Sequence, residues 1–130
     1  MTDEFLGNAN FLTSDQTVSA SCPSNIALIK YWGKYDQQIP ANPSISYTLN
    51  HCRTNTTIAF YAGDAFGVQT FLSGKEEFKF AEKIGKYFKT ISEYLPWILT
   101  GRYVISTENT FPHSSGIASS ASGFGAIAKC

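Results

Sequence analysis

The residues best suited to chemistry lie in a small, hydroxyl-rich stretch between Pro112 and Gly123, with the sequence PHSSGIASSASG. The stretch contains no Asp, Glu, Lys or Arg. It follows a strand-like run over residues 103–107 and leads into a helical run over residues 121–129. A loop of small residues before a helix leaves backbone N–H groups free, and these groups and the helix dipole attract anions. The stretch therefore predicts a phosphate site, with a plain serine-rich N-cap before a packed helix as the alternative.

Two nucleotide-binding patterns fit this stretch poorly. No Gly-Lys-Ser/Thr closes it, so it is not a Walker A loop. Gly123, Gly125 and Ala128 match the loose form of the dinucleotide fingerprint, but they fall inside the expected helix rather than at a strand-to-helix turn. We interpret that match as accidental and expect the glycines to allow close helix packing.

A second informative stretch is NIALIKYWGK, which runs from Asn25 to Lys34. An apolar strand that ends in Lys30 places an ammonium group at the rim of a core, where a cation needs an anionic partner. Lys30 and Lys34 bracket Tyr31 and Trp32, which gives an anion pocket with aromatic walls. The alternative is a strand end whose lysines extend to water.

These stretches need a scaffold, and the chain alternates between two periodicities. Strand-like runs cover residues 16–21, 26–29, 44–49, 56–61 and 66–72, with Pro23 interrupting the first pair and the run at 26–29 expected to be buried. The runs at 56–61 and 66–72 are candidates for a hairpin. The order of strands, one helix, a strand, a loop and a final helix predicts an α+β fold.

The helix is expected near residues 76–95, because its apolar residues are spaced 3, 4, 3 and 4 apart. They are Ala81, Ile84, Phe88, Ile91 and Leu95. The lysines of this segment occupy the other faces, and we interpret them as a solvated surface; they are Lys79, Lys83, Lys86 and Lys89. Pro96 is expected to end the helix.

Composition narrows the class of protein. The chain has 130 residues, with ten basic and ten acidic side chains, so its charge predicts neither nucleic-acid binding nor a membrane surface. It shows no 18-residue apolar run and no secretory signal. Its three cysteines are widely spaced and form neither a disulfide pattern nor a zinc pattern, which indicates a reducing cytoplasm.

The ends of the chain give two further expectations. Residues 1–15 are polar and without periodicity, so we expect a loosely held leader before a single lobe over residues 16–130. The chain stops at Cys130 within a helical run and without a capping residue, so we expect it to be the N-terminal part of a longer protein.

Taken together, the motifs resemble one family. The Asn25 to Lys34 block resembles the N-terminal signature of diphosphomevalonate decarboxylases, which belong to the GHMP kinase superfamily. PANPSIS, which starts at Pro40, resembles that family's next block. Glu108-Asn109 and the stretch from Pro112 to Gly123 resemble its ATP phosphate loop. The blocks occur in the family's order, and the resemblance spans residues 19–129.

The sequence also departs from the family pattern. Pro43 stands where the family has a small or hydroxyl residue, and HSSGI from His113 stands where it has TAAGL. We expect these changes to be tolerated in a loop that works mainly through its backbone. His113 is interpreted as a loop-lining residue, with a titrating role as the alternative. In the family the catalytic aspartate and the C-terminal lobe come after the position of Cys130.

The resemblance implies a fold, an activity and a set of sites. The fold is an incomplete GHMP-type N-terminal lobe, like domain 2 of ribosomal protein S5. The activity is MgATP-dependent conversion of diphosphomevalonate to isopentenyl diphosphate through phosphorylation of the 3-hydroxyl, in the mevalonate pathway of isoprenoid biosynthesis. The parent protein is expected to be a cytoplasmic homodimer.

The implied sites lie in the two stretches. Substrate would contact Asn25, Lys30, Tyr31 and Lys34, with Lys30 nearest the reacting groups as the catalytic contact. The ATP phosphates would be held by loop residues, and the hydroxyl of Ser120 would reach Mg²⁺ through them; these residues are Pro112, Ser115, Gly116, Ala118, Ser119 and Ser120. Phosphomevalonate decarboxylase, mevalonate 3-kinase and a non-catalytic module of the same fold remain alternatives.

Overall fold

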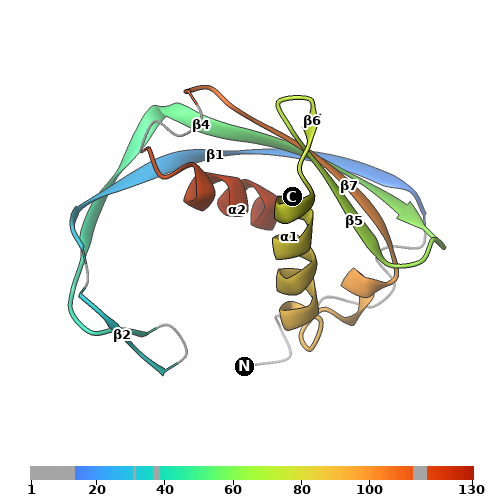
Figure 1. Cartoon of the computed structure of the whole chain (residues 1–130), viewed down its shortest axis with the longest axis horizontal. Coiled ribbons are helices and arrows are strands. Elements are labelled where there is room, and N and C mark those ends of the chain that lie inside the picture. Colours follow the sequence, from blue (N-terminus) through green and yellow to red (C-terminus); the bar gives the residue numbers. More distant parts are fainter. Residues whose placement is uncertain (1–13, 31, 37–38, 113–116) are drawn as a thin grey trace.

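The computed structural model describes residues 14–30, 32–36, 39–112 and 117–130. Its main sheet has five strands in the order β1-β4-β7-β5-β6. Their bounds are β1 (Gln16–Ile29), β4 (Ile45–Ala62), β7 (Gly101–Asn109), β5 (Gly67–Leu72) and β6 (Lys75–Glu76). Strands β2 (Lys34–Tyr35) and β3 (Ile39–Pro40) form a separate ribbon. The helices are α1 (Phe78–Ile91), the 3₁₀ helix η3 (Pro96–Leu99) and α2 (Ser119–Lys129). Figure 1 shows α1 and α2 on the same side of the sheet.

The core lies between this sheet and its helices. Alternate residues of β4 and β7 are buried, as a sheet with one covered face requires. They meet the apolar faces of α1, η3 and α2 in one cluster, formed by Ile58, Phe60, Ile84, Phe88, Ile98, Tyr103, Ile105 and Ile127. The α+β class predicted from the sequence is confirmed.

Helix α1 confirms the predicted apolar face, but it is shorter than expected. Ile84 and Phe88 are buried, whereas the helix ends at Ile91 and not at Pro96. The N–H groups of Tyr94 and Leu95 both bond to the carbonyl of Ile91, which closes a turn. Leu95 then takes the extended conformation that a residue before proline prefers, and Pro96 begins η3.

The strands are longer than the sequence indicated. Residues 16–21 and 26–29 belong to one strand, β1, with a shift in register between Pro23 and Ser24. Pro23 therefore marks an irregularity and does not interrupt the strand. It is tolerated because β1 is an edge strand that pairs only with β4. Likewise, the runs at 44–49 and 56–61 fall, apart from Ser44, in the single strand β4.

The predicted hairpin between residues 56–61 and 66–72 is wrong. Strand β7 lies between β4 and β5, antiparallel to the first and parallel to the second. A parallel pair needs a long crossover, and α1 and η3 provide it between β5 and β7. The tight turn after β5 instead forms the β5–β6 hairpin, with Ser73 and Gly74 at φ values of 49° and 80°.

The prediction that residues 26–29 are buried is also wrong, because Ile26 and Ala27 are only half-buried and the other two residues are exposed. Leu28 and Ile29 are 67% and 51% exposed, and Ile45, which pairs with Ile29 on β4, is exposed as well. In Figure 1 this part of β1 and β4 curves away beyond the helices and leads to the β2–β3 ribbon. The continuous apolar run correctly predicted a strand. This part of the strand is not buried because, within the described residues, no helix covers it.

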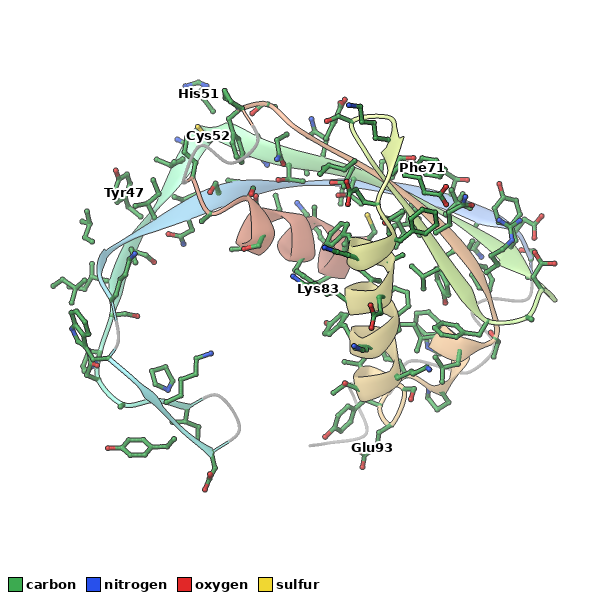
Figure 2. The ribbon with its side chains drawn as sticks, in the orientation of Figure 1. Tyr47, His51, Cys52, Phe71, Lys83 and Glu93 are labelled. Carbon is green, nitrogen blue, oxygen red and sulfur yellow. The ribbon has the colours of Figure 1, made fainter. Side chains whose placement is uncertain are left out.

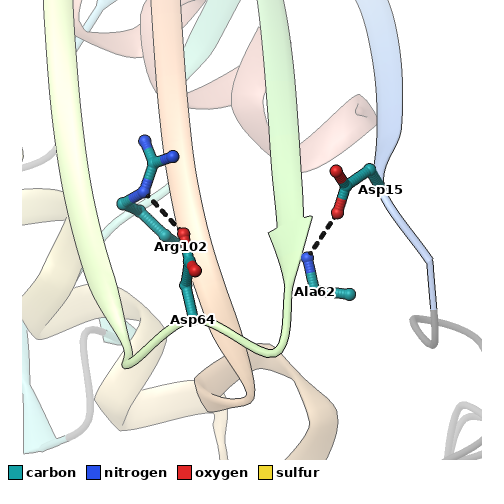
Figure 3. Close-up of polar contacts among 4 residues, drawn as sticks. All are labelled: Asp15, Ala62, Asp64 and Arg102. Atoms are coloured by element: carbon teal, nitrogen blue, oxygen red, sulfur yellow. Dashed lines mark hydrogen bonds and ion pairs between the residues drawn. The ribbon is translucent and has the colours of Figure 1, made fainter.

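Surface contacts fasten the other end of the sheet. Asp15 accepts a hydrogen bond from the N–H of Ala62 at 2.9 Å, and Arg102 Nε lies 3.0 Å from Asp64 Oδ2 (Figure 3). The guanidinium also lies 4.2 Å from the ring centroid of Tyr61. An exposed ion pair of this kind contributes about 0–1 kcal/mol to the free energy of unfolding. These contacts therefore hold the strand ends together but add little to the stability that the core provides.

Candidate functional site

A cleft of about 620 Å³ opens where the start of α2 faces α1 and the β5–β6 hairpin. Ser119, Ser120 and Gly123 line it from α2. Thr54, Thr107 and Asn109 line its floor from β4 and β7. The cleft thus brings the end of the predicted phosphate loop together with residues from five other elements, namely β4, β5, β6, β7 and α1.

The first turn of α2 has backbone donors that an anion could use. The backbone N–H groups of Ser119 and Ser120 have no backbone acceptor among the described residues, and no side chain caps the helix. The turn also contains no acidic residue. Ala118, at the N-cap, has φ 44° and ψ 43°, a left-handed conformation that costs a non-glycine residue about 1–2 kcal/mol. Strain of this kind is common at ligand sites.

A buried hydroxyl network fixes this turn to the sheet. Thr54 Oγ1 lies 2.7 Å from Asn109 Oδ1 and 2.7 Å from Ser122 Oγ, which lies 3.2 Å from the carbonyl oxygen of Ser119. Thr54 and Ser122 are each only 1% exposed. Residues from β4, β7 and α2 therefore share one set of hydrogen bonds directly beneath the cleft.

Three lysines supply positive charge to the same cleft. Lys75 comes from β6, and Lys79 and Lys83 come from α1; Glu77 is the acidic residue on its lining. In Figure 2, Lys83 lies on the side of α1 that faces α2. Among the described residues, the only ion pair on α1 joins Lys86 to Glu82 at 2.7 Å, and it holds the pKa of Glu82 below its usual value.

None of these three lysines was predicted from the sequence to line a site, although the prediction that Lys79 and Lys83 lie at the surface is confirmed. One local signal was available. Lys79 lies in the first turn of α1, where a positive charge opposes the helix dipole and acidic residues are preferred. Lys83 follows four residues later on the same face. A lysine in an unfavourable helical position with no local acidic partner indicates a role outside the helix.

The loop is also tied to the first predicted block. Ser24, fully buried on β1, donates a hydrogen bond to the carbonyl of Ile117, just before the N-cap of α2. Asn25, the next residue, is exposed and pairs with Thr48 on β4. The beginning of the NIALIKYWGK block and the end of the phosphate stretch therefore lie together.

The rest of that block lies elsewhere. Lys30 and Lys34 are exposed and neither lines the cleft, and Trp32 is 87% exposed. Asn42, to which the sequence analysis gave no role, organises this segment. Its Oδ1 accepts from the N–H of Trp32 at 2.6 Å, and its Nδ2 donates to the carbonyl of Pro43 at 2.9 Å. The turn at residues 40–43 thereby holds the backbone at Trp32.

Several predicted site residues fall outside the described residues, namely Tyr31, His113, Ser115 and Gly116. Of the remaining ATP-loop residues, Pro112 and Ser120 are exposed, whereas Ala118 and Ser119 are half-buried. Gly123 and Gly125 lie inside α2, as expected. A Cβ on Gly125 would stand 2.6 Å from Cys22 Sγ, so this glycine does allow close packing of α2 on β1, whereas a Cβ on Gly123 would meet only ordinary contacts.

Two features, a metal-binding cluster and a membrane-spanning helix, are not found in the described part of the chain. In residues 14–30, 32–36, 39–112 and 117–130, no group of three His, Cys, Asp or Glu side chains is placed to hold a metal ion. The helices in that part of the chain are also too short or too polar to cross a bilayer. The donors of the cleft are ammonium groups, backbone N–H groups and hydroxyls, a set that suits phosphate oxygens.

The sheet with α1 and α2 on one side, and the cleft at the start of α2, form an α+β lobe whose fold is also found in known proteins. The family described as the diphosphomevalonate decarboxylase-like N-terminal domain matches residues 22–130. The chain therefore belongs to this family, as the resemblance of its motifs indicated.

Individual relatives agree with the family match. The diphosphomevalonate decarboxylase of Ganoderma lucidum is 36% identical over 123 residues, which is 84% of this chain and 31% of that protein. The crystal structure of mevalonate diphosphate decarboxylase from Staphylococcus aureus superimposes with a TM-score of 0.76 and 36% identity, over 92% of this chain and 36% of that one. A structure of MDDEF in complex with MVAPP, AMPPCP and magnesium has a TM-score of 0.73 and 33% identity, over 88% and 35% of the two chains. The chain thus spans about a third of the length of these relatives.

Proposed function

We propose that this chain is the ATP- and substrate-binding N-terminal part of a diphosphomevalonate decarboxylase, with residues 1–15 as a leader and 16–130 as the lobe. The observation that carries the proposal is the cleft at the start of α2, which combines three lysines with helical N–H groups that have no backbone acceptor among the described residues. The family membership and the relative bound to AMPPCP and magnesium support it.

The phosphates of ATP fit the cleft by charge and by hydrogen bonding. The N–H groups of Ser119 and Ser120 point out of the helix start, where the dipole favours negative charge. Lys79 and Lys83 face them across the cleft, and their charges would stabilise negative charge on a transferring phosphoryl group. Positioning and charge stabilisation are the main contributions that proteins make to phosphoryl transfer.

Magnesium would neutralise charge on the nucleotide phosphates. Since the described residues offer no cluster of acidic ligands, the ion would be held mainly by the phosphates, with the exposed hydroxyl of Ser120 as the contribution of the chain. Pro112, Ser115, Gly116 and Ala118 complete the proposed loop.

The substrate would lie between the cleft and the NIALIKYWGK block. Asn25, Lys30, Tyr31 and Lys34 are proposed to bind diphosphomevalonate, with the charge of Lys30 nearest the reacting groups. The link between Ser24 and Ile117 supports this arrangement, because it holds the start of the block against the end of the phosphate loop. Phosphorylation of the tertiary 3-hydroxyl creates the leaving group that loss of carbon dioxide requires.

The same cleft would serve related reactions. Phosphomevalonate decarboxylase and mevalonate 3-kinase need the same nucleotide site, and a non-catalytic module would keep the fold alone. The lysines and serines around the cleft favour an enzyme, and the family match favours the diphosphate substrate. We further propose that the parent protein is a cytoplasmic homodimer of the mevalonate pathway.

The direct test is carbon dioxide release by a full-length protein that contains this chain, supplied with MgATP and mevalonate, its phosphate or its diphosphate. We expect turnover with the diphosphate, and turnover with another substrate alone would assign a sister activity. Lys30→Met, which removes the charge and keeps an unbranched side chain, should reduce kcat/KM by more than about tenfold with normal folding. Wild-type kinetics in this variant would remove Lys30 from the site.

A further inference from the structure

The hydroxyl network beneath the cleft determines how Asn109 presents its side-chain amide. Thr54 and Asn109 are directly opposite in the β4–β7 register, and the amide oxygen lies 2.7 Å from Thr54 Oγ1. An amide oxygen only accepts hydrogen bonds, so Thr54 donates its one hydroxyl proton to Asn109. Ser122 must then be the donor in its contact with Thr54. The carbonyl of Ser119, at 3.2 Å, is a second and weaker acceptor for the same Ser122 proton.

With these donors and acceptors assigned, the amide nitrogen of Asn109 faces away from the network. Its two N–H donors have no acceptor among the described residues, yet Asn109 lines the cleft together with Ser119 and Ser120. The cleft also carries Lys79 and Lys83, so an acceptor placed there is most favourably an anion. A donor of fixed orientation is therefore directed to the same space as the free N–H groups of α2.

We propose that Asn109 is a nucleotide-binding residue that donates a hydrogen bond to a phosphate oxygen, and that buried Thr54 is the positioning residue that sets its orientation. The proposal rests on the proposed function, because it names a further contact in the same ATP cleft. Through Ser122, Thr54 also holds the first turn of α2, so one buried hydroxyl aligns the side-chain donor with the backbone donors.

The test is binding of magnesium AMPPCP to the purified chain by isothermal titration calorimetry, with thermal unfolding measured on every variant. Asn109→Asp keeps an oxygen acceptor for Thr54 and replaces the donor with a negative oxygen, so affinity should fall by at least about tenfold without a change in Tm. Ser106→Asp is the matched control, because Ser106 lies on the same strand, is exposed and does not line the cleft. It should bind like the wild type.

Thr54 variants test the positioning role. Thr54→Ser keeps the hydroxyl and should retain wild-type affinity, whereas Thr54→Val should lose affinity and stability together. Wild-type affinity in Asn109→Asp would overturn the proposal. A fall in the Tm of Asn109→Asp would overturn it as well, since it would mean that the nitrogen and not the oxygen faces Thr54. Failure of the wild-type chain to bind would instead contradict the nucleotide site itself.

Discussion

Tyr103 offers the sharpest test of the core that supports the cleft. Its side chain is 5% exposed, and its ring packs against Phe60 and Phe88 with centroid distances of 5.0 Å in both pairs. Its hydroxyl is buried and has no hydrogen-bond partner among the described residues. A buried polar group without a partner costs about 1–3 kcal/mol. Tyr103→Phe keeps the ring contacts and removes that cost, so it should raise the free energy of unfolding by about 1–2 kcal/mol at pH 7.

The same residue predicts a dependence on alkaline pH. Burial raises the pKa of Tyr103 from 10.0 to about 12. The unfolded chain therefore loses this proton at a lower pH than the folded chain, so stability is complete below pH 10 and falls as the pH rises towards 12. At pH 11, one unit above the ordinary pKa, the loss amounts to about 1.4 kcal/mol.

Urea unfolding of the wild type and Tyr103→Phe at pH 7 and pH 11 measures both effects. The advantage of the variant should grow by about 1.4 kcal/mol between the two pH values, because the variant has no hydroxyl to ionise. Tyr94→Phe is the control, since Tyr94 is 41% exposed and should change neither quantity. Lower stability of Tyr103→Phe at pH 7 would mean that the hydroxyl has a partner, and a stability difference that is constant with pH would mean that its pKa is not raised by burial.

Three further predictions concern α2 and the chain as a whole. Gly125→Ala should destabilise the protein by about 1–3 kcal/mol, because its Cβ would stand 2.6 Å from Cys22 Sγ. In a Cys22→Ala background the same change should stabilise by up to about 1 kcal/mol through helix propensity, and equal effects in both backgrounds in urea unfolding would contradict the contact. Ser120→Ala in a full-length enzyme should lower kcat by more than about tenfold, and unchanged kinetics would make Ser120 a structural residue. The 130-residue chain alone should release no carbon dioxide from diphosphomevalonate with MgATP, since none of its ten acidic residues matches the catalytic aspartate that the family resemblance implies; turnover above a control without ATP would overturn this.

The sequence predicted the elements well where periodicity follows burial. The apolar residues of α1 identified its buried face, and the small residues before α2 located the start of that helix within two residues. The order of the strands in the sheet was harder to predict from the sequence. Two strand-like runs that are neighbours in the chain usually form a hairpin, so the sequence favoured a hairpin over a crossover. Only the contacts of β7 with both β4 and β5 reveal that a strand separates them.

The site was predicted in part for a similar reason. Ser119 and Ser120 belong to a local motif, so the sequence alone located them. Lys79 and Lys83 belong to another element, and Thr54 and Asn109 are 55 residues apart in the chain. Such residues come together only when β4, β7 and α2 pack. Their roles depend on long-range contacts that no short pattern contains.

The central claim is that the start of α2 binds the phosphates of a nucleotide. Amide NMR of the ¹⁵N-labelled chain, titrated with magnesium AMPPCP, tests it most directly. Phosphate binding at the start of α2 should give the largest shifts at the N–H groups of Ser119 and Ser120, and smaller shifts at Lys79 and Lys83 across the cleft. Shifts confined to other parts of the chain, or none at saturating nucleotide, would contradict it.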